Sequence, residues 1–308
     1  MTVRHRITVE ELESAWNSRL CPALRKRVET SDLTYEVLTP EERDAYLIEV
    51  VEELMKPNVV KAGPHRQADW EMGWGENLAI LQSGTPAEAI MPRYHGKRSL
   101  VRWRQEVVRP VEPLFDYRIH TILVDWAIDT FLKDVGSLFE FGCGPAYHLL
   151  RARQFNPSAK LVGLDWATAS QKIIGEIVTR GIETNIQGFN FDFFKPDDSI
   201  KIPSNSGIYT VAALEQVGAN FEPFLQFLLE KRPTICMHLE PIDELMTPGH
   251  LIDRLSVMYS RKRNYLNGFL THLRKLEEEG RITIHKEQRT YSGSFFLEGH
   301  SLVVWSPR

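Results

Sequence analysis

The segment from Ser137 to His148 combines an acid, two glycines and a proline at a spacing that suits cofactor binding. Its first half, Ser-Leu-Phe-Glu-Phe, is typical of a buried strand and carries Glu140 near its end. Gly142 and Gly144 follow, and glycine can adopt a positive φ and let a ligand approach the backbone closely. Pro145 suits the first turn of a helix, where its missing N–H costs nothing. A glycine turn before a helix N-terminus predicts free N–H groups and a site for a nucleotide-like cofactor with a carboxylate or phosphate.

This turn departs from the dinucleotide motif Gly-x-Gly-x-x-Gly, in which the third glycine lets the helix pack on the strand. Tyr147 occupies the third position here, so a dehydrogenase is the weakest of the functions considered. Cys143, between the two glycines, is interpreted as a small residue that fills space and not as a nucleophile.

A second acid ends the next apolar run, Lys160-Leu-Val-Gly-Leu-Asp165, 23 residues after Gly142. An acid at the carboxyl end of this strand can accept both ribose hydroxyls of an adenosine. Trp166 follows directly and is expected to lie against an adenine face. Phe191 or Phe193 could supply the second face of such an aromatic sandwich.

Taken in order, these segments resemble the class I S-adenosylmethionine methyltransferases, over about residues 114–308. An acid two residues before the first glycine resembles motif I of that family. The segment 207–217 resembles the fourth strand, with Gln216 in place of the usual His, and 234–241 resembles the fifth strand with its Glu-Pro exit. The resemblance implies S-adenosylmethionine as cofactor, with Asp192 binding the adenine amino group. The expected cofactor-binding residues are Glu140, Gly142, Cys143, Gly144, Asp165, Trp166, Asp192, Phe193 and Ala213.

The pattern of elements supports an α/β fold. From Phe115 the apolar residues follow a helical spacing, and strands and helices then alternate, which indicates a parallel, doubly wound sheet. Two helices at 251–262 and 265–279 precede strands at 281–289 and 300–305. We therefore expect, over 113–308, a Rossmann-like seven-stranded sheet flanked by helices, parallel except for the antiparallel last strand of the resembled family.

Residues 1–112 are expected to form a mostly helical lid or substrate region. Helices are predicted over 8–18 and from Thr39, the N-cap, through Leu54. Residues 57–76 are predicted to be a loop, and a short helix is expected over 76–82. Trp70 and Trp74, in that loop, are interpreted as packing residues of the lid.

The methyl acceptor should lie beyond the carboxyl ends of the strands. A general base there would come from His148, Glu215 or His238, although each has a structural interpretation as well. These are a hydrogen bond to backbone for His148, ordering of the cofactor loop for Glu215, and a place inside a strand for His238. The expected substrate-binding residues are Tyr147, Arg102 and Arg104.

Both arginines belong to the basic segment 93–109, which has six Lys or Arg against one acid and includes Tyr94 and Trp103. It could be an anion-binding lid, a contact surface for RNA, or a solvated helix face. The leading hypothesis is a methyltransferase for a small metabolite, anionic if this segment binds it, with O, N or C as the acceptor atom. The alternatives are an RNA or protein methyltransferase that uses this segment, and a non-catalytic S-adenosylmethionine-binding protein.

Composition sets further limits. The net charge of −4 and the pI of about 6.2 argue against a nucleic-acid partner. The three cysteines have neither disulfide nor zinc spacing, and no apolar run is long enough for a membrane span. We therefore expect a cytoplasmic protein without a metal site, whose helical N-terminal region could contribute a homodimer surface.

Overall fold

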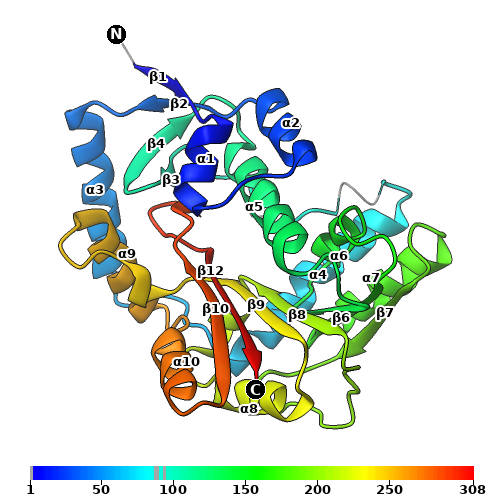
Figure 1. The fold of residues 1–308 in the computed structure, drawn as a ribbon. Helices are drawn as coiled ribbons and strands as arrows, with labels where there is room; N and C mark the ends of the chain where they lie inside the picture. Colours follow the sequence, from blue (N-terminus) through cyan, green and yellow to red (C-terminus); the bar gives the residue numbers. More distant parts are fainter. Residues whose placement is uncertain (1–2, 87–89, 93–94) are drawn as a thin grey trace.

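The computed structural model describes residues 3–86, 90–92 and 95–308. Its largest element is a seven-stranded sheet in the lower half of Figure 1, with the strand order β10-β12-β9-β8-β5-β6-β7. In chain order the strands are β5 (Ser137–Phe141), β6 (Lys160–Asp165), β7 (Ile186–Asn190), β8 (Ser206–Val211), β9 (Ile235–Glu240), β10 (Ile282–Gln288) and β12 (Ser301–Pro307).

The direction of these strands confirms the predicted fold. Strands β5 to β9 are parallel, whereas β12 is antiparallel to its two neighbours, β9 and β10. The chain runs outward from β5 through β6 to β7 and then returns to β8 on the other side of β5. The strand order thus reverses between β5 and β8, and a crevice at such a point is where open α/β sheets bind ligands.

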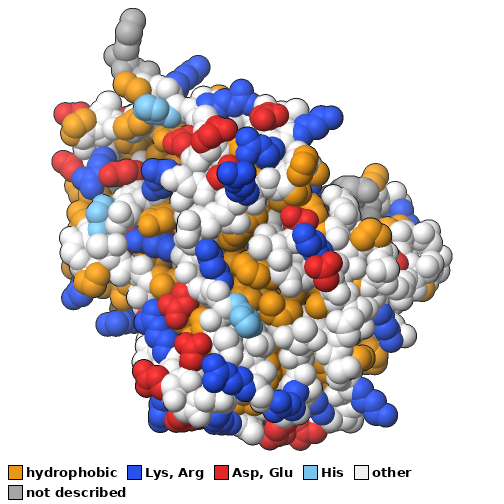
Figure 2. Space-filling model, in the orientation of Figure 1, with side chains coloured by type: hydrophobic (Ala, Val, Ile, Leu, Met, Phe, Trp, Pro, Cys, Tyr) orange, Lys and Arg blue, Asp and Glu red, His pale blue; other side chains and the backbone are white. Residues whose placement is uncertain are grey.

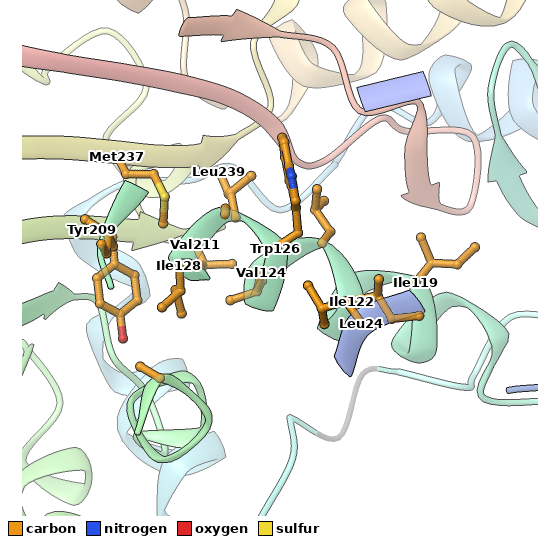
Figure 3. Packing of buried hydrophobic residues seen from close by; sticks show 14 of the residues in the cluster. Leu24, Ile119, Ile122, Val124, Trp126, Ile128, Tyr209, Val211, Met237 and Leu239 are labelled. Atoms are coloured by element: carbon orange, nitrogen blue, oxygen red, sulfur yellow. The ribbon is translucent and has the colours of Figure 1, made fainter. Parts of the chain in front are cut away.

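Helices cover both faces of this sheet. They are α5 (Phe115–Phe131), α6 (Tyr147–Ala152), α7 (Thr168–Thr179), α8 (Glu222–Lys231), α9 (Leu251–Lys262) and α10 (Phe269–Glu278). Side chains of β5 alternate between the faces: Leu138 packs in a cluster with α5, α6 and α7, whereas Phe139 and Phe141 pack with α8 and α10. Figure 3 shows α5 against the sheet, with Val124 and Ile128 among side chains of β8 and β9.

The N-terminal region contains the helices that the sequence predicted there and one more. They are α1 (Val9–Trp16), α2 (Pro22–Thr30), α3 (Pro40–Met55) and α4 (Gln67–Gln82). Thr8 and Thr39 each form a capping box, accepting a hydrogen bond from the backbone of the glutamate three residues on. The expected N-cap at Thr39 is therefore confirmed.

The expected loop at 57–76 was wrong in its second half, because α4 begins at Gln67. Gly73 and Gly75 suggested a loop, but both are helical residues at points of α4 that no other described segment contacts. A Cβ added at either position would meet nothing within 4 Å. Contacts with α7 and with the residue that follows it hold the helix in place. Glu71 Oε1 accepts from Ala169 N at 3.1 Å, and Arg180 donates to Leu81 O at 2.8 Å.

The N-terminal region is less helical than expected, because it also builds a second sheet, at the top of Figure 1. The strand order is β1-β2-β4-β3-β11, with all pairs antiparallel. The strands are β1 (Arg4–Arg6), β2 (Thr34–Val37), β3 (Val101–Trp103), β4 (Glu106–Pro110) and β11 (Ser292–Ser294). Since β11 comes from the C-terminal part of the chain, the sheet crosses the expected boundary at 112–113 and joins both parts.

A further apolar cluster ties α3 to α9, through Tyr46, Val50, Ile252 and Tyr259. The loop after α3 also bonds to the end of α9, with Ala62 N donating to Arg263 O at 2.7 Å. The N-terminal region therefore covers the carboxyl edge of the large sheet. Within the described ranges, no helix combines the length and apolar character that crossing a membrane requires.

Candidate active site

The glycine turn after β5 has the geometry that its sequence predicted. Gly142 has φ 75° and Gly144 φ 50°, in the region that favours glycine. A Cβ on Gly142 would lie 2.3 Å from that of Ala213, and one on Gly144 would lie 2.8 Å from the ring of Trp74. Two segments thus approach the turn closely, one following β8 and the other from α4.

The turn uses its own N–H groups differently from what we expected. Gly142 N and Cys143 N both donate to Leu164 O, at 2.7 and 3.1 Å, and Gly144 N donates to Asp165 Oδ2 at 2.8 Å. Helix α6 is only six residues long. The expectation that these N–H groups are free for a cofactor anion was wrong, since they tie the turn to the end of β6 instead.

Asp165 is the acid that holds this turn. Its Oδ2 accepts from Gly144 N, and its Oδ1 accepts from Ala167 N at 2.9 Å. Only 5% of the residue is exposed, and burial raises the pKa of its carboxyl group to about 6. Each carboxylate oxygen has a second lone pair, so Asp165 retains capacity to accept hydrogen bonds from a ligand.

A pocket opens beside the turn, at the point where the strand order reverses. Two aromatic pairs form its walls. Trp70 and Trp74 stack with ring centroids 5.6 Å apart, and Trp166 stacks on Phe194 at 6.3 Å. The complete lining is Trp70, Trp74, Gly142, Asp165, Trp166, Phe191, Phe193, Phe194, Ala212, Ala213, Gln216 and Val217.

The expected cofactor-binding residues divide into two groups. Five of them line this pocket: Gly142, Asp165, Trp166, Phe193 and Ala213. The other four lie around it or behind it. Gly144 is covered by Trp74, and the Sγ of Cys143 packs against Gly163, as a space-filling residue would. Asp192 Oδ1 accepts from Phe194 N at 2.8 Å and so shapes the turn that presents Phe193 and Phe194.

Glu140 was expected at the cofactor but lies on the opposite side of the turn. It shares its face of β5 with Leu138, is 1% exposed, and its carboxylate accepts from Tyr209 Oη at 3.2 Å. Its other oxygen lies 2.8 Å from His148 Nδ1. Glu140 therefore orients His148, and the structure replaces the expected backbone partner of His148 with this carboxylate.

Glu215 and Glu240 meet at the end of β8 and β9. Glu240 is fully buried and accepts three backbone N–H groups, from Ala213, Leu214 and Glu215, at 3.0–3.1 Å. It therefore fixes the loop that carries Ala213 and Gln216 into the pocket. Burial, with Glu240 nearby, raises the pKa of Glu215 to about 8, and Gln216 Nε2 donates to its Oε1 at 2.9 Å.

His238 was considered as a base, but the structure places it in the core. Its Nδ1 lies 3.0 Å from Thr210 Oγ1, and its ring packs between Phe269 and Trp305. Burial lowers its pKa to about 3, so it stays neutral. The interpretation as a histidine inside a strand is the one that the contacts support.

Of the three expected substrate residues, two are engaged elsewhere and one is exposed. Arg102 is 1% exposed and forms ion pairs with Asp253 and with Glu298, the latter at 3.3 Å. Arg104 is exposed at the tip of the hairpin between β3 and β4. The hydroxyl of Tyr147 is held by Tyr117 and by Arg151.

The basic segment forms a hairpin, not the helix face considered for it. Of its residues, Arg93 and Tyr94 lie outside the described part of the chain. Arg109 donates to Glu42 at 3.0 Å, and Arg98 lies over the ring of Phe295. On the face drawn in Figure 2, Lys and Arg side chains are interspersed with Asp and Glu. Pairing of this kind leaves little concentrated positive charge for an anionic partner.

Sequence reasoning underestimated Trp70, Trp74 and Gln216, which line the pocket. The signal was present, because residues four apart in a helix share a face. It was hidden by the glycines between and after the tryptophans. The indole N–H of Trp70 is buried and has no hydrogen-bond partner among the described residues, so the pocket offers one uncommitted donor.

Comparison with solved structures finds methyltransferases at low sequence identity. An O-methyltransferase family protein from Burkholderia thailandensis is 12% identical, over 63% of this chain and 57% of that one, with a TM-score of 0.46. Geranyl diphosphate methyltransferase in complex with S-adenosylmethionine is 10% identical, over 65% and 92%, with a TM-score of 0.46. Magnesium protoporphyrin IX methyltransferase from Synechocystis PCC 6803, with S-adenosylmethionine bound, is 12% identical, over 63% and 82%, with a TM-score of 0.43.

The chain therefore spans little more than half of the first of these proteins. No family model matches the sequence, and no curated protein does. The assignment of the fold rests on the order and direction of the strands. Among the residues that the structure describes, no group of three or more His, Cys, Asp or Glu is arranged to hold a metal ion.

Proposed function

We propose that this protein is an S-adenosylmethionine-dependent methyltransferase that acts on a small molecule. The observation that carries the proposal is the pocket at the reversal of the strand order, where Gly142, Asp165 and Ala213 come together between two aromatic pairs. An adenosine needs aromatic faces and a carboxylate for its ribose, and this pocket supplies both.

The residues fit the cofactor in three respects. Asp165 is buried, faces the pocket and has lone pairs left to accept from hydroxyl groups. Trp166 and Phe193 are the expected aromatic contacts, and the uncommitted N–H of Trp70 can donate to an oxygen. When bound, S-adenosylmethionine supplies an electrophilic methyl group.

The protein's own contribution to such a transfer is alignment and exclusion of water, because displacement at a sulfonium needs little further activation. Helix α4 serves this purpose, since it places Trp74 over Gly144 and is anchored to α7 by hydrogen bonds. The loop fixed by Glu240 closes the pocket from the other side.

A small acceptor fits better than RNA or an acidic protein. The arginines that would bind phosphate or carboxylate are paired with acids, as Arg102 and Arg109 are, or lie at the exposed hairpin tip, as Arg104 does. The sequence alone had suggested an anionic acceptor. Because these arginines are paired or lie at the exposed tip, we propose an acceptor without an anionic group.

Calorimetric titration with S-adenosylmethionine, S-adenosylhomocysteine and NADH tests the proposal. We expect micromolar binding of the first two and none of NADH, with Asp165→Ala weakening binding at least tenfold, since a charge-assisted hydrogen bond contributes about 1.5–3 kcal/mol. Glu183→Ala is a matched control, because that acid pairs with Arg153 away from the pocket. Binding of NADH alone, or an unchanged affinity in the Asp165 variant, would contradict the assignment.

A further inference from the structure

Helix α3 has more apolar side chains than its contact with the core uses. Tyr46 and Val50 point inward, where they pack with Ile252 of α9. Ile48 and Met55 lie on another side of the helix and are 61% and 77% exposed. One apolar face is enough to hold a surface helix on its protein. A second apolar face on the outside therefore indicates a further contact.

The exposed apolar residues of α3 and of its neighbour α9 lie in two rows. Positions separated alternately by three and four residues share one side of a helix and form the seam of a helix pair. On α3 this row is Asp44, Ile48, Val51 and Met55, and on α9 it is Leu251, Arg254, Met258 and Arg261. Every residue of both rows is exposed. Each row therefore has the spacing and the exposure that a contact with another helix needs.

The two rows belong to one surface, which we call the α3–α9 surface. Helices α3 and α9 pack against each other through a shared apolar cluster, at the left of Figure 1. Their carboxyl ends meet, because Lys262 Nζ donates to Leu54 O at 2.6 Å and to Lys56 O. A single partner can therefore contact both rows at once.

The two helices carry opposite charges on this surface. On α3, Asp44 lies in the row and Glu52 beside it, whereas the row of α9 contains Arg254 and Arg261. None of these four side chains forms an ion pair within the described part of the chain. Complementary charges across an interface favour the correct partner and fix its register. A partner must therefore present basic and apolar residues to α3, and acidic and apolar residues to α9, and a second copy of this chain presents both.

An antiparallel alignment of α3 with α9 of a second copy matches the residues along the two helices. It places Asp44 opposite Arg261 of the second copy, Ile48 opposite Met258, Glu52 opposite Arg254, and Met55 opposite Leu251. The steps between these positions differ by at most one residue, which is about 1.5 Å along a helix. A two-fold axis repeats the same contacts, with α9 of the first copy on α3 of the second. The surface is therefore complementary to itself in both charge and apolar residues.

We propose that the α3–α9 surface is the interface of a homodimer, in which α3 of each copy packs antiparallel on α9 of the other. The apolar residues exclude water from the contact, and the acid–arginine pairs set its register. The proposal does not rest on the proposed methyltransferase function, because no residue of either row lines the cofactor pocket.

Sedimentation velocity over a range of protein concentrations tests the dimer. At micromolar concentration we expect the wild type to sediment with twice the mass of the 35.5-kDa chain. Glu52→Arg should weaken the dimer about tenfold or more, because it places an arginine opposite Arg254 in both halves of the interface. Arg254→Glu should weaken it to a similar extent, because it places an acid opposite Glu52 twice.

Glu278→Arg is the matched control. It makes the same change of charge at an exposed acid of another helix, α10, which contributes to neither row. We expect this variant to sediment as the wild type does, so that a loss of the dimer in Glu52→Arg reports on the position of the charge and not on the net charge of the chain.

Mixing the two single variants distinguishes this pairing from other modes of association. Glu52→Arg carries the arginine that Arg254→Glu needs opposite its new acid, and the reverse holds as well. A mixed dimer therefore has one opposite-charge pair in each half of the interface. We expect an equal mixture to dimerise with a Kd within about threefold of that of the wild type, although neither variant does so alone.

Circular dichroism checks that each variant is folded, and the pair Asp44→Arg and Arg261→Glu replaces the first pair if one of its members is not. A wild type that stays monomeric at every concentration refutes the interface. Single variants that dimerise as the wild type does, or a mixture that stays monomeric, refute the antiparallel pairing. Failure of the wild type to bind S-adenosylmethionine would refute the proposed function alone.

Discussion

Asp165→Asn is expected to stabilise the folded protein while it weakens cofactor binding. In the folded state the carboxyl group is 5% exposed, and burial raises its pKa from 3.8 to about 6. A raised pKa means that the folded state holds the proton more tightly than the unfolded state does. The stability that this group contributes is therefore complete below pH 4 and is lost as the pH rises through 6.

The magnitude follows from the two pKa values. One pKa unit corresponds to about 1.4 kcal/mol, so ionisation of Asp165 above pH 7 costs the folded state roughly 3 kcal/mol. Between pH 5 and pH 8 the contribution changes by about 1.4 kcal/mol, because at pH 5 the unfolded state is already ionised. Asparagine does not titrate and keeps one oxygen for either Gly144 N or Ala167 N. Between pH 5 and pH 8, the free energy of unfolding of the variant should therefore rise by about 1.4 kcal/mol relative to that of the wild type.

Urea unfolding at pH 5 and pH 8 measures this difference, and calorimetry measures the cofactor affinity. We expect the variant to gain about 1.4 kcal/mol relative to the wild type between the two pH values and to bind S-adenosylmethionine at least tenfold more weakly. A variant that is less stable by the same amount at both pH values would refute the reasoning. It would mean that the two N–H donors outweigh the cost of burying the charge.

Further predictions concern buried charge and packing. Arg102→Met should lower the free energy of unfolding by about 3–5 kcal/mol, because it leaves buried acids without their cation. The control Arg104→Met, at an exposed residue, should change it by less than about 0.5 kcal/mol. Equal urea midpoints for the two variants would contradict this prediction. Gly142→Ala places a Cβ 2.3 Å from that of Ala213 at a φ of 75° and should weaken cofactor binding at least tenfold by calorimetry, so an unchanged Kd would show that the turn does not shape the pocket. Trp74→Ala should weaken cofactor binding by about 1 kcal/mol, roughly fivefold, through loss of one stacked ring, without changing the urea midpoint as much as Arg102→Met does.

The large sheet was predictable because its signals are local. The central parallel strands β5, β6, β8 and β9 are short, mostly apolar runs that are buried along most of their length. The turn after β5 needs residues with a positive φ, and the sequence supplies Gly142 and Gly144 there. The position of Asp165 was predictable for the same reason, because it is the last residue of a buried apolar strand. Its place in the pocket agrees with this prediction.

The small sheet was not predictable in the same way, because its strands are short and its pairing is distant. Strand β3 has three residues and pairs with β11, so Val101 meets Ser294 across most of the chain. A three-residue strand has no periodicity to detect. The first half of α4 was not predicted for a related reason. Gly73 and Gly75 are compatible with a loop and equally with the open side of a helix, so the sequence does not distinguish the two.

Side-chain partners were the least predictable feature. Arg102 lies inside β3 and points into the protein, whereas Arg104 lies just past the end of that strand, at an exposed turn with a positive φ. Their shared charge hides this difference in the sequence. Glu140 has the spacing of a cofactor residue, but the alternation of β5 turns it toward α6 and His148. Only the fold brings His148 to His120, which no motif of the sequence had singled out.

The carboxyl edge of the large sheet concentrates acids that cost stability. Burial raises the pKa of Asp165 to about 6 and that of Glu240 to about 7, and burial beside Glu240 raises that of Glu215 to about 8. Each of these acids therefore destabilises the folded state increasingly as the pH rises through its own value. Because packing alone would favour apolar residues at these positions, their presence argues for a function at this edge. Glu240 holds the loop of one wall and Asp165 holds the glycine turn, so the same charges that weaken the fold give the pocket its shape.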